Sequence, residues 1–333
     1  MRHSLGFALV LVLAATGCKG GDTGTMGDDT TSPDASVIDP PRRGFQVISP
    51  EITITPNQEI TYCYYFKTPN TENMVIKRWA SVMSPGSHHM IMFGTPTEVQ
   101  PAGTVSASQC GVGGASAQNL PAWLYAAQTP TADLALPTDD GTGKPLGQEI
   151  KAASPAYIQM HYLNATDNDM KVHVTLNAEA YEVGEAYTPT APYVTFNGQI
   201  NIAANPTKDP SILDVESQTC STPPGTKFWL VSTHAHKQAV KTEVKNGMPA
   251  STDLAFTSTD WEHPGTKAWM QSPFYTFTGD KLTYACTYNN IGSNSSRPIS
   301  TGDSAQTDEM CMATGYYFPA PKSRICYNGF LLP

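Results

Sequence analysis

The chain contains 333 residues, of which 40% are hydrophobic and 15% are charged, and its formal net charge is −9. The 20 Lys and Arg residues are scattered along the sequence rather than clustered. This pattern argues against nucleic acid or another polyanion as a partner.

The first 17 residues have the pattern of a secretory signal peptide. A short basic start at 1–3 precedes an apolar run at 5–15 that is too short to span a bilayer. The run ends in Leu-Ala-Ala-Thr-Gly-Cys at 13–18, which resembles a bacterial lipobox, so we expect Cys18 to be lipidated. Lys19 does not resemble an inner-membrane retention signal, and we therefore expect a cell-envelope lipoprotein on the outer membrane of a Gram-negative bacterium. The alternative is an ordinary signal peptide with an incidental cysteine.

Residues 18–43 are rich in Gly, Asp, Thr, Ser and Pro and carry few apolar side chains, which predicts a lipidated, disordered tether. Folding is expected to begin at Gly44. The remaining stretch is longer than one small sandwich needs, so it predicts two domains or one large domain. No further long apolar run follows, and membrane contact is expected through the lipid anchor only.

The body of the chain has the pattern of an all-β protein. Short runs of β-branched and aromatic residues, such as 51–55, 172–176 and 227–231, lie between turns rich in Pro, Gly, Asn and Asp. Only 115–127 offers a helical pattern. The frequent short strands favour antiparallel β-sandwiches over a parallel α/β sheet.

The segment Thr-Pro-Thr-Ala-Pro at 188–192 interrupts the strand pattern and indicates a domain boundary. We expect an N-terminal sandwich at 44–190 and a C-terminal sandwich at 191–333. A site is expected at their shared face, because clefts between domains are favoured positions for cofactors and substrates.

Six cysteines remain after Cys18, and in an oxidising compartment this even number predicts three disulfides. The six are Cys63, Cys110, Cys220, Cys286, Cys311 and Cys326. Six cysteines allow 15 pairings, and their positions alone do not select one.

Five of the eight histidines fall into three groups that indicate a metal site: His88-His89, His161 and His234-Ala235-His236. Residues two apart in a strand face the same side, so His234 and His236 present two imidazoles to one ion. Adjacent His88 and His89 need a strand end, a bulge or different ring nitrogens to bind together. The alternative is that these are ordinary surface or core histidines, as we expect for the unpartnered His173 and His263.

Imidazole ligands suit zinc, copper, iron and nickel, while a thioether ligand favours Cu(I). Met310, beside Cys311, is a candidate thioether ligand, although a methionine in such a position is often a core filler.

Four motifs in this order resemble the copper type II, ascorbate-dependent monooxygenases, the family of peptidylglycine α-hydroxylating monooxygenase and dopamine β-monooxygenase. The motifs are Ser-His-His-Met-Ile-Met-Phe at 87–93, Gln-Met-His-Tyr at 159–162, Thr-His-Ala-His at 233–236 and Asp-Glu-Met-Cys at 308–311. The resemblance implies two copper ions per chain. An electron-transfer copper would be held by His88, His89 and His161, and a catalytic, O2-activating copper by His234, His236 and Met310.

The resemblance also implies two consecutive jelly-roll-like antiparallel β-sandwich domains whose coppers face each other across an open cleft. It implies the disulfide pairs Cys286–Cys311 and Cys220–Cys326, and with them Cys63–Cys110 as the third. The implied reaction hydroxylates a C–H bond of an organic substrate with O2, using ascorbate or another one-electron donor as co-substrate. Gln159 and Tyr162 match the motif around His161 and are candidate supports for that site, or strand-packing residues.

The chain departs from the family where peptidylglycine-type enzymes bind the substrate carboxylate. Ser232, Met312 and Thr314 replace the arginine, asparagine and tyrosine expected there, so a peptide with a C-terminal glycine is not expected as the substrate. Two other functions stay open. One is a copper-binding envelope lipoprotein without turnover, and the other is a structural or adhesive β-sandwich surface protein whose histidines bind no metal.

Overall fold

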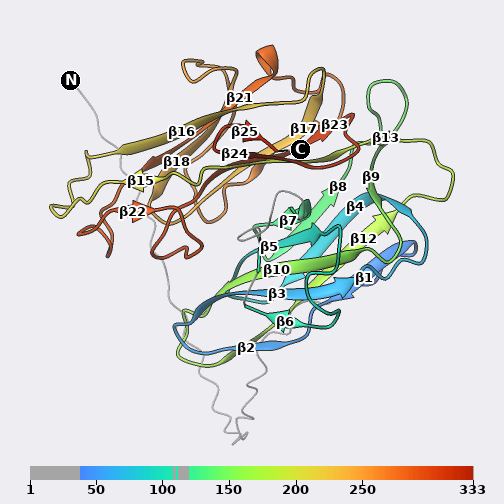
Figure 1. The fold of residues 1–333 in the computed structure, drawn as a ribbon, viewed down its shortest axis with the longest axis horizontal. Helices are drawn as coiled ribbons and strands as arrows, with labels where there is room; N and C mark the ends of the chain where they lie inside the picture. Colours follow the sequence, from blue (N-terminus) through green and yellow to red (C-terminus); the bar gives the residue numbers. More distant parts are fainter. Residues whose placement is uncertain (1–37, 108–109, 112–119, 333) are drawn as a thin grey trace, which may run out of the picture. The chain divides into compact units, whose positions relative to one another are not determined.

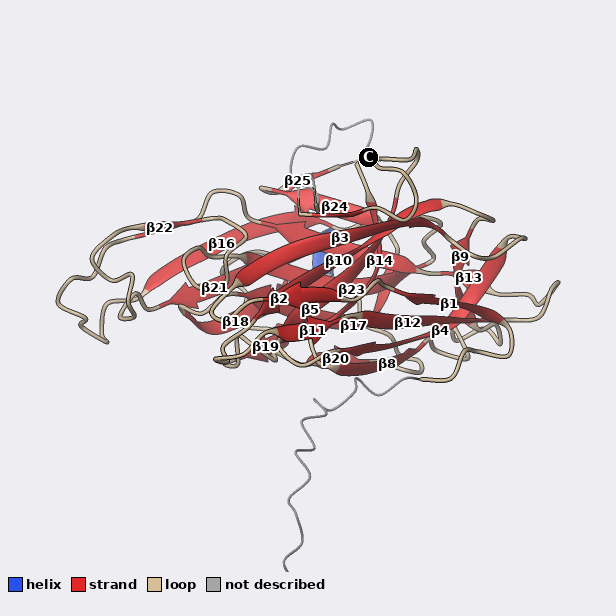
Figure 2. Cartoon of the chain, turned by 90° about the horizontal axis from the view of Figure 1, so that it is seen from below, coloured by secondary structure: helices blue, strands red, loops and turns tan. Residues whose placement is uncertain are grey.

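The regular secondary structure of the described part is almost wholly β-strand, and loops and turns connect the strands (Figure 2). The computed structural model describes residues 38–107, 110–111 and 120–332. The predicted signal peptide, Cys18 and the tether up to residue 37 lie outside the described residues. Within the described part, the one helical element is the short 3-10 helix η1 (Thr278–Asp280), and no helix there is long and apolar enough to cross a membrane.

The strands of the N-terminal half, β1 to β13, pair only with one another (Figure 1). The outer sheet has the order β1 (Gly44–Ile48), β12 (Val174–Ala180), β4 (Met74–Met83), β9 (Leu146–Ile150) and β13 (Thr188–Pro189), with β8 (Thr131–Ala135) also paired to β4. The inner sheet has the order β6 (Val105–Ser106), β3 (Glu59–Lys67), β10 (Pro155–Leu163), β5 (Ser87–Gly94) and β7 (Ala122–Ala127). A small third sheet pairs β11 (Met170–Val172) with β2 (Ile52–Ile54).

The strands of the C-terminal half, β14 to β25, likewise form sheets of their own. One sheet has the order β20 (Thr266–Ala268), β17 (Lys227–Ala235), β23 (Cys311–Phe318), β14 (Ala191–Phe196), β24 (Arg324–Tyr327) and β25 (Phe330–Leu331). Another has the order β16 (Asp214–Ser221), β21 (Lys281–Tyr288), β18 (Ala239–Asn246) and β19 (Leu254–Ser258). A third pairs β15 (Asn201–Ile202) with β22 (Ile299–Ser300).

Most strand pairs are antiparallel, and the parallel exceptions among the named strands are β13 with β9 and β14 with β24. The predicted all-β, antiparallel class is therefore confirmed. The jelly-roll-like arrangement of each half and the domain bounds 44–190 and 191–333 stay predictions.

The predicted helical pattern at 115–127 is wrong where the structure describes it. Strand β7 occupies Ala122–Ala127 and pairs with β5. Trp123, Tyr125 and Ala127 are buried while the residues between them are half-buried, which is the two-residue period of a strand. Residues 115–119 lie outside the described part.

The two halves share apolar packing. The largest core cluster surrounds Trp79 of β4, which is fully buried, and it includes Trp229 of β17 and Phe318 of β23. A smaller cluster packs Phe93 and Trp123 of the N-terminal half against Met312 of the C-terminal half. Residues Ala35–Pro333 accordingly form one compact unit.

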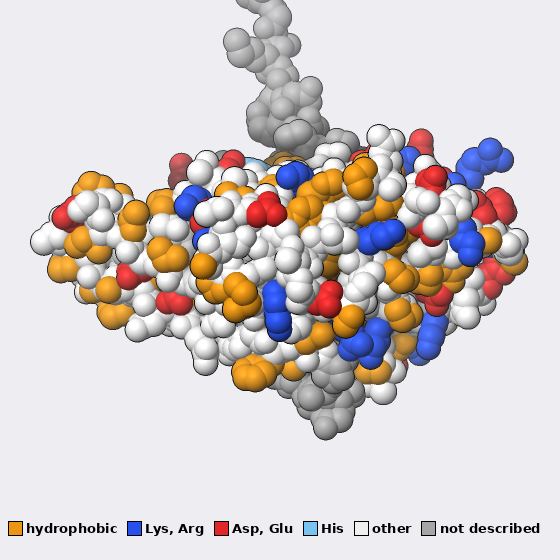
Figure 3. All heavy atoms as spheres, turned by 90° about the horizontal axis from the view of Figure 1, so that it is seen from above, with side chains coloured by type: hydrophobic (Ala, Val, Ile, Leu, Met, Phe, Trp, Pro, Cys, Tyr) orange, Lys and Arg blue, Asp and Glu red, His pale blue; other side chains and the backbone are white. Residues whose placement is uncertain are grey.

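Three disulfides fasten the strands, and their pairs are those that the resemblance implied. Cys63 pairs with Cys110, Cys220 with Cys326, and Cys286 with Cys311. The surface visible in Figure 3 carries acidic and basic side chains scattered among apolar and polar ones, without a block of one sign.

Candidate metal centre

The first histidine group comes from two neighbouring strands of the inner sheet, β5 and β10. His89 of β5 stands opposite His161 of β10, but Ser87 stands opposite Tyr162, so His88 is the extra residue of a β-bulge. The bulge lets His88 and His89 approach the same ion, as their adjacency required. Their ring centroids are 5.1 Å apart, and those of His88 and His161 are 5.3 Å apart.

The second group lies at the end of β17. His234 belongs to the strand, and His236 follows its last residue, with ring centroids 5.4 Å apart. Both side chains are buried, and His236 is completely inaccessible to solvent. The two imidazoles lie side by side, although His236 is one residue beyond the strand and the two-residue period of β17 does not extend to it.

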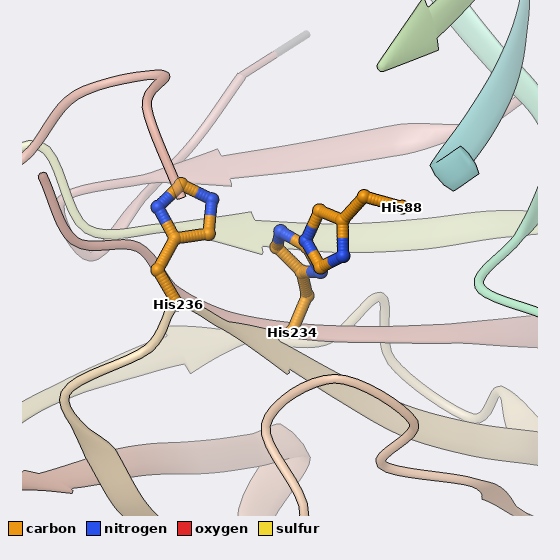
Figure 4. Close-up of side chains that lie close together, drawn as sticks. All are labelled: His88, His234 and His236. Atoms are coloured by element: carbon orange, nitrogen blue, oxygen red, sulfur yellow. The ribbon is translucent and has the colours of Figure 1, made fainter. Parts of the chain in front are cut away.

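The two groups meet through His88 and His89. The ring centroid of His89 lies 5.2 Å from that of His234. The ring centroid of His88 lies 5.5 Å from that of His234 and 6.0 Å from that of His236, and Figure 4 shows these three side chains converging. The ligand nitrogens of His88, His234 and His236 lie within 4.8 Å of one another, and so do those of His88, His89 and His161. The open cleft implied by the resemblance is wrong for this structure, because the five imidazoles form one histidine cluster.

Four nitrogens in the histidine cluster are buried without a hydrogen-bond partner in the described structure: His88 Nε2, His89 Nδ1, His234 Nε2 and His236 Nε2. Buried polar atoms are normally paired, because losing hydration without a new partner costs free energy. Neutral nitrogens gathered in this way are suited to a metal ion, for which imidazole is a common ligand. The residues present therefore fit the copper ions that the resemblance implies.

Burial, followed by repulsion from the neighbouring imidazoles, lowers the pKa of His88 to about 3. The same causes lower the pKa of His89 and of His234 well below the usual value. Burial is also the largest cause that lowers the pKa of His236 to about 4. These four imidazoles are thus neutral near pH 7, and a metal ligand must be neutral.

Three of the imidazoles are oriented by hydrogen bonds from the ring nitrogen that faces away from the cluster. His234 Nδ1 donates to Gln128 Oε1 at 2.6 Å, and His236 Nδ1 donates to the Asp308 carbonyl at 3.3 Å. His161 Nε2 donates to the Glu59 carboxylate at 3.0 Å. Such contacts select the tautomer and fix the ring plane of a metal-binding histidine.

Glu59 does more than orient His161, because it also binds the C-terminal half. Its carboxylate accepts hydrogen bonds from Ser304 Oγ at 2.8 Å and from the Ala305 N–H at 2.7 Å. Burial alone would raise the pKa of Glu59, but these donors and His161 outweigh it and lower the pKa to about 2. Gln128 makes a second link, since its Nε2 donates to the Thr233 carbonyl at 3.2 Å.

Glu309 joins the segment after β17 to the segment that carries Met310. It is fully buried, and its carboxylate accepts backbone N–H groups from His236 at 3.0 Å, Gln238 at 2.7 Å and Met310 at 3.3 Å. Burial is the dominant influence and raises the pKa of Glu309 to about 8, against the lowering effect of the three N–H donors. The side chain thereby fixes the spacing between His236 and Met310.

Met310 lies beside the histidine cluster at a cavity of about 490 Å³, where His89 and His234 are also exposed to the cavity. The neighbouring Cys311 begins β23 and is tied to β21 by its disulfide with Cys286. The six predicted ligands are thus brought to one region. Of the two candidate supports, Gln159 lines the cavity, whereas Tyr162 is buried in the largest core cluster.

The sequence interpretation missed Glu59, Gln128 and the role of Glu309. Glu309 stands within the quoted motif at 308–311, so its position beside Met310 was a usable signal. Glu59 and Gln128 lie 102 and 106 residues from the histidines that they contact, and nothing in their local sequence marks them. Trp261, whose ring centroid lies 5.7 Å from that of His88, was also not singled out.

Residues 214–330 match the family described as "Copper type II ascorbate-dependent monooxygenase, C-terminal domain". The matched segment contains His234, His236 and Met310. No curated protein matches the sequence.

Among solved structures, the cryo-EM structure of Broad Bean Stain Virus is similar over 90% of this chain and 95% of that chain, at 10% identity and a TM-score of 0.30. The structure titled "The Triple Jelly Roll Fold and Turret Assembly in an Archaeal Virus" is similar over 86% of this chain and 62% of that chain, at 8% identity and a TM-score of 0.18. These likenesses are too weak to carry an argument about fold or function.

Proposed function

We propose that the chain is a copper type II ascorbate-dependent monooxygenase, because residues 214–330 match the C-terminal domain of that family, and that it hydroxylates a C–H bond of an organic substrate with O2 and ascorbate or another one-electron donor. The observation that carries the proposal is the histidine cluster, in which four buried ring nitrogens have no hydrogen-bond partner in the described structure and are free to bind a metal ion. In the overall reaction one atom of O2 enters the product alcohol and the other leaves as water. The two electrons and two protons that this requires come from the donor and the solvent.

We assign His88, His89 and His161 to an electron-transfer copper and His234, His236 and Met310 to the copper at which O2 and substrate react. Copper bound there supplies one-electron redox chemistry and O2 activation. The protein supplies neutral imidazoles whose tautomers are fixed by Glu59, Gln128 and the Asp308 carbonyl.

The position of Met310 selects the reacting side of the cluster. A thioether is a weak, soft ligand, so it suits a copper that is reduced and that exchanges its remaining ligand during turnover. Met310 also borders the cavity together with His234, which gives a substrate access to that side. The apolar packing around Met310 limits the water that competes with the substrate there.

The short distance between the two histidine groups supports direct electron transfer from the electron-transfer copper to the copper at which O2 and substrate react. Because the rings of His88 and His234 are in contact range, an electron delivered at one group has no solvent-filled gap to cross. The two groups touch through both His88 and His89, and the bulge at His88 is therefore part of the proposed arrangement.

The proposal is tested by comparing the copper-loaded parent protein with Met310→Ile, and with Met248→Ile as a matched exposed control. Copper per chain and ascorbate-dependent O2 consumption are measured for each. We expect two coppers and O2 consumption in the parent and the control, and at least a tenfold loss of O2 consumption in Met310→Ile. If the parent bound copper but consumed no O2, the proposal would be wrong and the protein would be a copper-binding protein without turnover. If the parent bound no copper tightly, the protein would be a structural β-sandwich.

A further inference from the structure

The cavity beside Met310 is enclosed by both halves of the chain. Phe93 and Trp123 on one side and Met312 on the other belong to a buried apolar cluster, so this part of the wall is firmly packed. Gln128, Gln159 and Thr314 also line the cavity, together with His89, His234 and Met310. A volume of about 490 Å³ falls among cavities that accept small organic ligands.

The described side chains that line the cavity offer no cation to a substrate. None of the described residues that line it is Lys or Arg, and the only carboxylate among them is Asp303, which is exposed to solvent. The undescribed segments 108–109 and 112–119, which adjoin Cys110, Gly111 and Leu120 in the chain, contain no Asp, Glu, Lys or Arg in their sequence.

Apart from Asp303 at the exposed edge, the described hydrogen-bonding side chains of the cavity are neutral. The amide of Gln128 is already engaged by His234 and by the Thr233 carbonyl. Gln159, at the centre of β10, and Thr314 of β23 are the polar neutral side chains that a ligand can address from opposite halves. A charged group that enters such a space loses its hydration without gaining an opposite charge, which is costly.

Resting on the proposed function, we propose that the cavity selects an uncharged, predominantly apolar substrate, and that it discriminates against both carboxylates and protonated amines. The apolar body of the substrate would pack on Phe93, Trp123 and Met312, with one C–H bond directed to the side of the histidine cluster marked by Met310. A neutral hydrogen-bonding group, such as an amide or hydroxyl, would be met by Gln159 or Thr314.

The test uses four probes of similar shape: butylbenzene, 4-phenylbutanamide, 4-phenylbutanoate and 4-phenylbutylamine. Their dissociation constants for the copper-loaded full chain are measured at pH 7 by equilibrium dialysis. We expect the two neutral probes to bind at least tenfold more tightly than the acid and the amine. Equal or tighter binding of the acid or the amine would overturn the proposal, and so would the failure of both neutral probes to bind.

A gain-of-charge variant provides the second arm. Thr314→Arg places a guanidinium among the lining residues and should favour the acid over the amide by at least tenfold, whereas the uncharged Thr314→Leu should keep the preference for neutral probes. Ile325→Arg repeats the substitution on β24 if the first variant does not fold. An unchanged preference in a folded arginine variant would show that the probes bind elsewhere and overturn the assignment of the cavity.

Dialysis requires no turnover, so failure of this proposal and failure of the proposed function are distinguishable. Copper content and ascorbate-dependent O2 consumption of the same preparation report on the monooxygenase. Selective binding of neutral probes without O2 consumption would support the preference for uncharged ligands and reject the proposed monooxygenase activity. O2 consumption together with preferred binding of the acid or the amine would support the monooxygenase and reject the proposed class of substrate.

Discussion

Replacement of Glu59 by glutamine tests whether a carboxylate of the N-terminal half both orients His161 and holds the segment that precedes Met310. In the parent, one carboxylate accepts hydrogen bonds from His161, Ser304 and the Ala305 N–H. Glutamine keeps one accepting oxygen but turns an NH2 group toward at least one of these donors. Because a hydrogen bond to a charged group contributes about 1.5–3 kcal/mol, we expect the free energy of unfolding to fall by about that amount.

The same substitution should weaken the copper bound through His161 by about 10–100-fold, the usual effect of removing a partner of a metal-binding histidine. Competition with a chelator measures this affinity, and urea denaturation of the apo-protein measures the stability. Glu51→Gln is the matched control, because Glu51 makes only an exposed ion pair with Lys171. If Glu59→Gln left both quantities within error of the parent, our reading of Glu59 would be refuted.

Three further predictions concern the surroundings of the histidine cluster. Gln128→Leu removes the acceptor for His234 Nδ1 and should weaken copper binding at His234 by about 10–100-fold in chelator competition, whereas Gln128→Glu, which keeps an acceptor, should lose less. Glu309→Leu leaves three backbone N–H groups without their acceptor and should lower the free energy of unfolding by about 3 kcal/mol or more in urea denaturation, with a smaller loss for Glu309→Gln. The pKa values of His88 and His236 are lowered to about 3 and about 4, below the value of about 6.5 for a histidine in an unfolded chain. Between about pH 4 and pH 6.5 these two histidines therefore bind more protons in the unfolded apo-protein than in the folded one. The free energy of unfolding of the apo-protein should fall as the pH is lowered from about 6.5 toward about 4. A rise over this range would contradict the burial of neutral imidazoles.

The strand content of the protein could be predicted from the sequence because a two-residue alternation of apolar side chains is a local property. The exception is 122–127. Trp123, Tyr125 and Ala127 alternate as in a strand, but Leu124 and Ala126 between them are strong helix formers, so the segment also fits a helix. Pairing with β5 decides the outcome, and pairing is a long-range interaction that local propensity does not contain.

The candidate ligands could be identified because their chemistry and their order along the chain are distinctive. The requirement for a bulge at His88 also followed from geometry alone, since adjacent strand residues otherwise point to opposite faces. The side chains that orient the ligands could not be predicted in this way. Glu59 and Gln128 reach the cluster across more than 100 residues of sequence, and only the packing of the two halves brings them there.

The most direct test of the central claim is the position of copper in crystals of the loaded protein, determined from anomalous diffraction at the copper absorption edge. The account predicts two peaks per chain, one among His88, His89 and His161 and one among His234, His236 and Met310. A single peak, or peaks away from these side chains, would contradict the paired copper centre on which the proposed monooxygenase depends.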